Sequence, residues 1–167
     1  MNITIRLAAP ADAPEMAEIH MRSWEAAYRD IIPIEYIREK NATRPALWKR
    51  ILIDDNTTEY AIQSGGKIIG IMGIAVSRDE DADNAICELK SIYLHPDHFR
   101  QGIGTQAMAF AFEKARKLGK SVMTLWVFAE NDNSIKFYEK CGFAPDGKTK
   151  TLDCGKKMDC VRMRKNL

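Results

Sequence analysis

The stretch between Leu89 and Gly119 constrains the fold of this chain more than any other part of the sequence. Residues 89–94 alternate in the manner of a strand that is covered on both faces. One predicted face carries Leu89, Ser91 and Tyr93, and the other carries Lys90, Ile92 and Leu94. From Ile103 the apolar spacing becomes helical, and Gly119 stands where a left-handed helix cap is expected. The sequence therefore predicts a strand, a loop and a helix in direct succession.

The loop before the predicted helix carries two glycines that expose the backbone of the first helical turn. Gly102 and Gly104 lack the side chains that would hold a ligand away from that backbone. The first amides of a helix have no partner inside it and lie at the positive end of its dipole, so they bind phosphate well. The loop predicts a pyrophosphate cradle, although relief of strain in a tight loop is the simpler interpretation.

Two better-known phosphate motifs fit this chain less well. A Walker-type loop ends in Gly-Lys-Ser/Thr, and Gly66-Lys67-Ile68 lacks the hydroxyl. The spacing Gly102-x-Gly104-x-x-Ala107 satisfies the dinucleotide fingerprint, but seven residues separate the predicted strand from the first glycine. That fold makes a tight turn directly after the strand, so dinucleotide binding is kept as a weaker alternative.

Two sequence blocks are similar to the acetyl-CoA motifs of the GNAT superfamily of N-acetyltransferases. The first block, residues 100–105 (RQGIGT), resembles the family pattern Gln/Arg-x-x-Gly-x-Gly/Ala. Phe99 departs from this pattern, because the family has Gln or Arg at that first position. The second block, residues 130–143 (ENDNSIKFYEKCGF), resembles the family segment Asn-x-x-Ala/Ser-x-x-Phe-Tyr-Glu-Lys-x-Gly-Phe.

The resemblance implies a fold and a set of cofactor-binding residues. The implied fold is a single GNAT-like domain over residues 1–167, of the α/β (α+β) class. Its three layers contain a central mixed, mostly antiparallel sheet, which is parallel where the two central strands splay and is flanked by helices. The residues implied to bind acetyl-CoA are Ile92, Tyr93, Leu94, Phe99, Arg100, Gln101, Gly102, Ile103, Gly104, Thr105, Asn131, Ser134, Phe137 and Tyr138.

The chemistry of acetyl transfer then assigns roles to a few side chains. Tyr138 occupies the general-acid position of the family, and a phenol can protonate a departing thiolate at neutral pH. Glu88 is the carboxylate predicted to accept the proton of the amine, provided that burial raises its pKa, and an exposed glutamate at the strand edge is an equal alternative. Trp24 and Tyr28 are candidates for walls of the acceptor site, and aromatic core is the simpler interpretation for each.

The predicted function is transfer of an acetyl group from acetyl-CoA to a primary amine of a small molecule or peptide, by direct attack in a ternary complex. The alternative is a non-catalytic acyl-CoA or nucleotide-binding module that uses the same cradle. The amine itself stays open among amino acids, polyamines, aminoglycosides and peptide N-termini.

Composition limits the partners. The net charge is only +2 and the charges are interspersed, which argues against nucleic acid as a partner. The four cysteines form no Cys-x-x-Cys pair, so we expect no metal and a reducing, cytoplasmic location. No apolar run is long enough to span a membrane. The family resemblance makes a homodimer reasonable.

The remaining elements follow from periodicity and turn signals. A strand is predicted over residues 3–7, a helix from Asp12 or Ala13 to Tyr28, and a second helical region in two pieces, 35–40 and 45–53. Strands 59–64 and 67–76 form a hairpin at Gly65-Gly66, and the acidic segment 77–84 is a solvated loop. The strand 121–128 is expected to pair in parallel with the central strand, and segments 143–148 and 157–164 form a closing hairpin.

Overall fold

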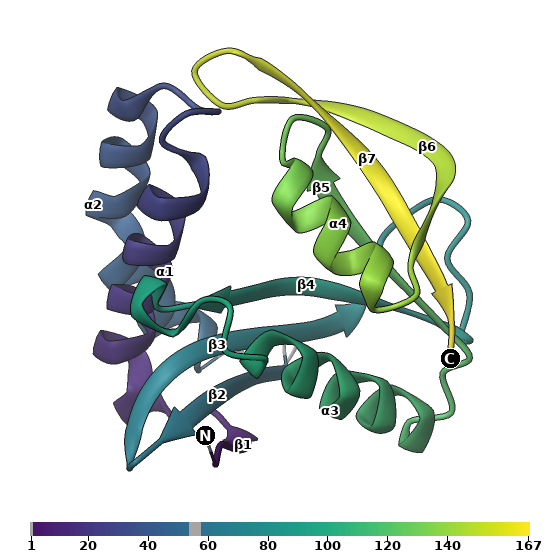
Figure 1. The fold of residues 1–167 in the computed structure, drawn as a ribbon, viewed down its shortest axis with the longest axis horizontal. Coiled ribbons are helices and arrows are strands. Elements are labelled where there is room, and N and C mark those ends of the chain that lie inside the picture. The colour runs from purple at the N-terminus through teal and green to yellow at the C-terminus, as the bar shows by residue number, and fades with distance from the viewer. Residues whose placement is uncertain (1, 54–57) are drawn as a thin grey trace.

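The computed structural model describes residues 2–53 and 58–167, which form a seven-stranded sheet with helices on both faces (Figure 1). The strand order is β1-β2-β3-β4-β5-β7-β6. The strands are β1 Thr4–Leu7, β2 Thr58–Ser64, β3 Lys67–Val76, β4 Ile86–Leu94, β5 Val122–Phe128, β6 Ala144–Asp153 and β7 Lys157–Asn166. The helices are α1 Ala13–Tyr28, α2 Ile34–Ile51, α3 Ile103–Lys117 and α4 Asp132–Lys140, with short 3-10 turns at η1 Pro10–Asp12 and η2 Pro96–His98.

The sheet is mixed, as predicted. Every neighbouring pair of strands is antiparallel except β4 and β5, which run parallel. The parallel pairing covers only Ile86–Glu88 against Val122–Thr124, and beyond it the two strands diverge (Figure 1). The crossover through α3 and the splay of the central strands are therefore both confirmed.

Two apolar cores hold the helices against the sheet. On one face, α1 and α2 pack on β2 and β3 around Met16, Ile19 and Trp48. On the other face, α3 packs on the sheet through a stripe of small and apolar side chains that includes Ile103, Ala107 and Met108. Residues of α4 border this second core, so the sheet is the middle of three layers.

A β-bulge in β4 overturns the predicted alternation of that strand. Gly73 pairs with Ser91 and the next residue, Ile74, pairs with Leu89, so Lys90 is an extra residue without a partner on β3. Because one inserted residue moves the following side chains to the opposite face, Leu89 lies in the same core as Ile92 and Leu94. The prediction that placed Leu89 with Ser91 and Tyr93 was wrong.

The second helical region is one continuous helix rather than two pieces. α2 runs from Ile34 to Ile51 with Pro45 inside it, although a proline removes a helical hydrogen bond at a cost of about 3 kcal/mol. Its buried side chains recur at helical spacing across the proline: Ile37, Asn41, Arg44 and Trp48. Burial of this stripe against α1 offsets the local cost, and it brings Asn41 and Arg44 into the interior.

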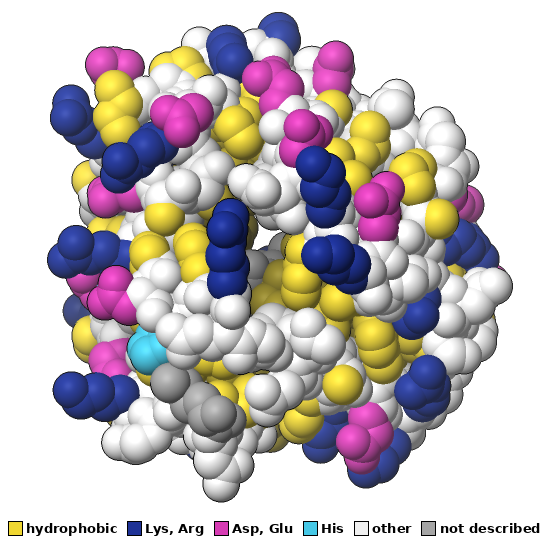
Figure 2. All heavy atoms as spheres, in the orientation of Figure 1, with side chains coloured by type: hydrophobic (Ala, Val, Ile, Leu, Met, Phe, Trp, Pro, Cys, Tyr) yellow, Lys and Arg dark blue, Asp and Glu magenta, His cyan; other side chains and the backbone are white. Residues whose placement is uncertain are grey.

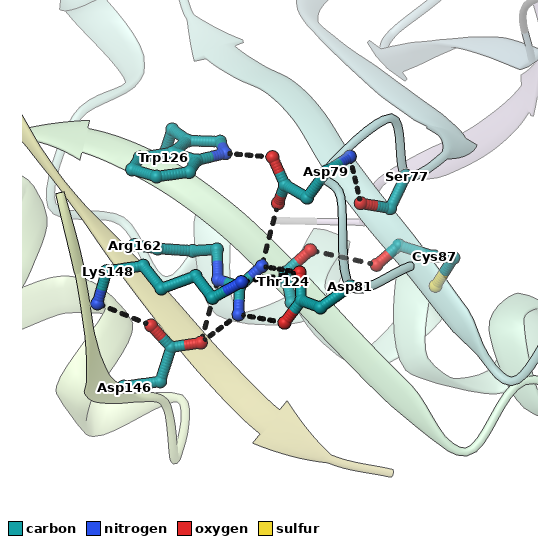
Figure 3. Close-up of polar contacts among 9 residues, drawn as sticks. All are labelled: Ser77, Asp79, Asp81, Cys87, Thr124, Trp126, Asp146, Lys148 and Arg162. Carbon is teal, nitrogen blue, oxygen red and sulfur yellow. Dashed lines mark hydrogen bonds and ion pairs between the residues drawn. The ribbon is translucent and has the colours of Figure 1, made fainter. Parts of the chain in front are cut away.

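The acidic segment 77–84 is anchored to the sheet, which corrects its interpretation as a solvated loop. Arg162 of β7, 2% exposed, donates to Asp79 at 3.0 Å, to both oxygens of Asp81 at 2.7 Å and to Asp146 at 2.7 Å (Figure 3). Trp126 of β5 also donates to Asp79, at 3.2 Å (Figure 3). We call Arg162, Asp79, Asp81 and Asp146 the arginine clamp.

The turn between β6 and β7 packs against the helical side of the molecule (Figure 1). It reaches across to the connection between α1 and α2 (Figure 1), where Cys154 and Met158 share a small core with Ile32 and Ile37. In the space-filling view, the face between the α1–α2 side and the α4 side is hollowed (Figure 2).

Candidate active site

The N-terminus of α3 presents unpaired amides, as the two glycines predict. The first helical hydrogen bond runs from the Gln106 amide to the Gly102 carbonyl, so residues 103–105 offer amides without an intrahelical acceptor. Gly102 adopts a left-handed backbone with φ of 76°, and no side chain caps the helix. The Ile103 side chain is in the core, so its contribution to a ligand is through the backbone. These features suit a diphosphate.

Gly104 also brings α3 and α4 together. A Cβ on Gly104 would lie 3.1 Å from two carbons of the Phe137 ring, so glycine permits this close approach. The second sequence block, which contains Phe137, is therefore beside the first. Phe99, Arg100 and Gln101 lie at the exposed side of the same loop.

The splay leaves one edge of β4 available. β5 pairs only as far as Glu88, while residues 92–94 pair with β3 on their other side. The outer backbone groups of Ile92, Tyr93 and Leu94 therefore face the gap between the two strands. The amides of a pantetheine arm can hydrogen-bond there in the manner of an added strand.

Asn131 caps α4 with the oxygen of its side-chain amide. Its Oδ1 accepts from the Ser134 amide at 3.2 Å, so Asn131 rather than Asn133 is the N-cap of this helix. The side chain is 5% exposed, and its Nδ2 has no hydrogen-bond partner among the described residues. A buried amide that keeps a free donor is suited to a ligand oxygen, because leaving it unpaired is costly.

Three tyrosines meet where the strands splay. Tyr93 of β4 accepts a hydrogen bond from Trp24 Nε1 at 3.2 Å. Tyr28 lies close enough to Tyr93 and Tyr138 for their phenols to act electrostatically on it. Burial raises the pKa of Tyr138, and the nearby Tyr93 phenol raises it further, so the Tyr138 hydroxyl stays protonated at neutral pH. The structure thus gathers predicted acid, cofactor and acceptor residues in one place.

The cavity beside this cluster lies between α1, α2 and the sheet. Its volume is about 420 Å³, which suits a small molecule. Aromatic side chains form part of its wall: Trp24, Trp48 and Tyr93. His20 stacks on Tyr93 with 4.5 Å between ring centroids. We call this cavity the acceptor pocket.

Glu88 lies beyond the lining of the acceptor pocket. Burial raises the pKa of its carboxyl and the nearby Asp79 adds to this, as a proton acceptor requires. Two cations that act on Glu88, Arg78 and Lys90, do line the pocket. Its role as a base stays a prediction.

Three polar residues of the pocket escaped the sequence analysis. Arg44 was hidden because Pro45 divided its helix in the prediction, which removed the inward stripe that contains it. Glu59 has the same strand parity as the buried Ala61, and that parity was an available signal. His20 has the helical spacing of the buried stripe of α1, which favours a core role, and the structure puts it at the pocket wall.

The mixed sheet with its splayed central strands is the fold of an acetyltransferase family, and comparison with known proteins agrees. The model of the acetyltransferase (GNAT) family matches residues 13–143, and the chain belongs to that family. The structure matches PaiA N-acetyltransferase from Thermoplasma acidophilum, solved in complex with coenzyme A, with a TM-score of 0.79. The two chains are 22% identical and each is covered completely, so this likeness concerns the fold.

Two sequence relatives are also named as N-acetyltransferases. The uncharacterized N-acetyltransferase YuaI of Bacillus subtilis is 31% identical over 138 residues, which is 82% of this chain and 78% of the relative. An uncharacterized N-acetyltransferase of Methanocaldococcus jannaschii is 28% identical over 141 residues, or 84% of this chain. The match spans only 60% of that relative's length.

None of the helices in residues 2–53 and 58–167 is both long and apolar enough to span a membrane. Within the same ranges, no group of three or more His, Cys, Asp or Glu side chains is placed to hold a metal ion.

Proposed function

We propose that this chain transfers an acetyl group from acetyl-CoA to a primary amine of a small molecule or peptide, in a single ternary complex. One observation carries the proposal: the unpaired amides of α3, the free edge of β4 and the protonated Tyr138 hydroxyl border the same splay. Acetyl-CoA carries a pyrophosphate, an amide-bearing arm and a thioester in that order. The α3 amides would bind the first, the edge of β4 the second and the Tyr138 hydroxyl the third.

The chain's own residues have the following roles. The amides at residues 103–105, with Gly102 and Gly104 leaving room, hold the diphosphate, and positive Arg100 lies beside it. The outer edge of β4 at Ile92–Leu94 binds the pantetheine amides, and a main-chain amide near Leu94 polarises the thioester carbonyl. The free Nδ2 of Asn131 donates to the cofactor, and Ser134 and Phe137 border the groove.

The reaction needs three proton transfers. The ammonium first loses a proton to a carboxylate or a water chain, for which Glu88 is our candidate because burial raises its pKa. The neutral nitrogen attacks the thioester carbon, and the C–S bond breaks as the C–N bond forms. Tyr138 donates its proton to the sulfur, and the nitrogen's second proton restores the phenol, so that an N-acetyl product and CoA thiol result.

Substitution of Tyr138 by Phe tests this function. The variant keeps the ring contacts with Phe137 and Phe143 but cannot protonate the thiolate, so kcat falls by about 10²–10⁴-fold. The affinity for CoA, measured by calorimetry, stays close to that of the wild type. Tyr60→Phe is the matched control, because Tyr60 packs on Phe110 in the core around α3.

The kinetic readout is thiol release with a panel of amines. Unchanged kcat in the Tyr138→Phe variant would remove this phenol from the mechanism. Binding of CoA without thiol release from any amine would instead support the alternative, a non-catalytic acyl-CoA-binding module. We also infer a reducing cytoplasmic location, which is supported by four free cysteine thiols.

A further inference from the structure

The acceptor pocket contains three buried polar side chains that each keep one atom without a hydrogen-bond partner. Among the described residues these atoms are His20 Nε2, Arg44 Nε and Glu59 Oε2. The three residues are 8%, 8% and 5% exposed, and all of them line the pocket. Unpaired buried polar atoms are rare because each one costs free energy, and three around one cavity indicate that a ligand pairs with them.

Arg44 supplies an unpaired positive charge at the helical wall of the pocket. Its guanidinium carbon lies 4.3 Å from the centre of the Trp24 ring, so the aromatic face fixes the plane of the group. No described residue forms an ion pair with it, and burial lowers the pKa of this guanidinium. A flat guanidinium that is held in place and lacks a counter-ion is suited to a carboxylate.

His20 adds a neutral donor to the same wall. Trp48 Nε1 donates to His20 Nδ1 at 3.2 Å, and an indole N–H can only donate, so Nδ1 is the acceptor. Burial lowers the pKa of His20 to about 3, with Arg44 and Lys90 adding to the effect. The ring is therefore neutral at physiological pH, its proton is on Nε2, and this N–H is the atom without a partner.

Glu59 supplies the acceptor on the sheet wall. Its Oε1 receives a hydrogen bond from Lys90 at 3.3 Å, while its Oε2 has no partner among the described residues. Gly73 leaves room for this carboxylate, because a Cβ there would lie 2.6 Å from Oε2. Both Arg44 and Glu59 act electrostatically on the Tyr93 phenol, which places the two charges near the same hydroxyl.

We propose that the acceptor is an amino acid, whose carboxylate pairs with Arg44 and His20 and whose amine donates to Glu59. This inference rests on the proposed acetyl transfer, since it names the amine that the same site uses. The free donors and the free acceptor of the pocket match the two charged groups of a zwitterion. Trp24 and Trp48 offer apolar walls for its side chain.

The remaining charges argue against the other classes of amine. Among the residues that the structure describes, four cations line the pocket, Arg44, Arg50, Arg78 and Lys90, against one carboxylate, that of Glu59. A polyamine or an aminoglycoside carries several positive charges, and such a lining repels them. A peptide N-terminus lacks a carboxylate next to its amine, so it leaves Arg44 and His20 unpaired.

The test compares amino acids with the same molecules lacking the carboxylate. Wild-type protein saturated with CoA is titrated by calorimetry with phenylalanine, phenethylamine, methionine, 3-(methylthio)propylamine and spermidine, and thiol release from acetyl-CoA is followed in parallel. We expect each amino acid to bind at least about 10-fold more tightly than its decarboxylated amine, and kcat/KM to follow the same order. Equal affinity within these pairs, or a preference for spermidine, would overturn the inference.

Arg44→Gln and a control on the same helix locate the effect. Arg44→Gln should remove the preference for the amino acid over its decarboxylated amine. The affinity for the amine should change much less than that for the amino acid, and the affinity for CoA should not change. The matched control, Lys49→Gln, changes an exposed residue of α2 outside the pocket lining and should keep the preference. Glu59→Gln should weaken both members of each pair, because both carry the amine.

The two proposals fail separately in this design. Carboxylate-dependent binding without thiol release supports the amino-acid site and overturns acetyl transfer. Thiol release from amines with no carboxylate preference supports acetyl transfer and overturns the amino-acid site.

Discussion

At the scale of single residues, His20 and Tyr138 are both buried, and burial moves their pKa values in opposite directions. Charging a histidine adds a positive charge and charging a tyrosine adds a negative one, so desolvation lowers the first pKa and raises the second. Both side chains consequently stay neutral at physiological pH. The Tyr138 hydroxyl remains a proton donor, and His20 remains a hydrogen-bond donor rather than a fixed charge.

His20 makes the free energy of unfolding depend on pH. Its pKa is about 3 in the folded protein and about 6.5 in an unfolded chain, so the unfolded state binds the proton first as pH falls. The stability associated with neutral His20 is complete above about pH 6.5 and declines toward pH 3. The expected slope is about 1.4 kcal/mol per pH unit for one proton.

The measurement is chemical denaturation of the wild type and of His20→Gln between pH 7 and pH 4. Gln does not titrate there, so the variant should lose stability less steeply than the wild type by about this slope. His98→Gln, in η2 and outside the lining of the acceptor pocket, serves as the control. Parallel pH profiles for the wild type and the His20 variant would contradict the assignment of a neutral buried ring.

The functional residues that the sequence could predict are those that their immediate neighbours in the chain identify. Asn131 and Tyr138 lie in one short block, so their spacing could be compared with a family pattern without knowing the fold. Arg44 and Glu59 come from α2 and β2, and only the sheet brings them to one pocket. The parity of Glu59 with Ala61 indicates only that its side chain is buried, not which groups it meets, and Pro45 concealed the helical stripe that contains Arg44.

At the scale of elements, the arginine clamp holds the β3–β4 connection against the sheet edge formed by β5, β7 and β6. Hydrogen bonds from Arg162 lower the pKa of Asp81, and the Lys148 ammonium lies 3.0 Å from the same carboxylate. Replacing a buried, fully paired arginine leaves several carboxylates without a counter-charge. We therefore expect Arg162→Leu to destabilise the fold by about 3 kcal/mol or more at pH 7.

Acid should reduce the difference between this variant and the wild type. The folded pKa of Asp81 lies below its unfolded value of about 3.9, so the clamp's contribution is complete above that pH and is lost as pH falls through the folded value. Urea denaturation at pH 7 and pH 3 measures this. Lys148→Gln, which removes only the partly exposed partner, should cost less than about 1 kcal/mol.

The sequence predicted most elements where a turn or cap is encoded locally. Gly65-Gly66 joins β2 and β3, and Gly119 follows the end of α3 with a left-handed backbone at φ of 72°. The bulge at Lys90 could not be predicted, because it depends on the pairing of β4 with β3. The prediction divided α2 into two pieces for a similar reason, because its buried stripe is defined by packing against α1 and not by the local sequence.

At the scale of the whole molecule, two parts of one sheet are joined at the centre by three parallel residue pairs. β1–β4 continue into β5–β7 only through Ile86–Glu88 and Val122–Thr124. A ligand in the splay contacts both parts, so its binding free energy adds to the stability of the folded state. At 100 times the dissociation constant, CoA should stabilise the protein by about 2.7 kcal/mol.

Thermal unfolding with increasing CoA checks this expectation. For a chain of 167 residues the predicted rise in Tm is about 5–10 °C. NAD is the control ligand, because it carries a diphosphate but no pantetheine arm for the edge of β4. A shift with NAD alone would favour the dinucleotide interpretation of the glycine loop over the GNAT site.

The global topology was only partly accessible from the sequence. The parallel crossover through α3 follows from chain length and handedness, so β4 and β5 could be paired in advance. The strand of the closing hairpin that pairs with β5 could not be predicted, because both strands have a pattern that allows this pairing. The structure places β7 there, with Trp126 opposite Arg162, and the arginine clamp is built on that choice.

The insertion of β7 between β5 and β6 has a consequence for synthesis on the ribosome. Until residues 157–166 leave the exit tunnel, β5 has an unpaired edge and β6 has no neighbour at all. A nascent chain arrested before Lys157 would expose this edge to other polypeptides, and such edges promote aggregation. The nascent chain should therefore need protection by chaperones until β7 pairs with β5 and β6.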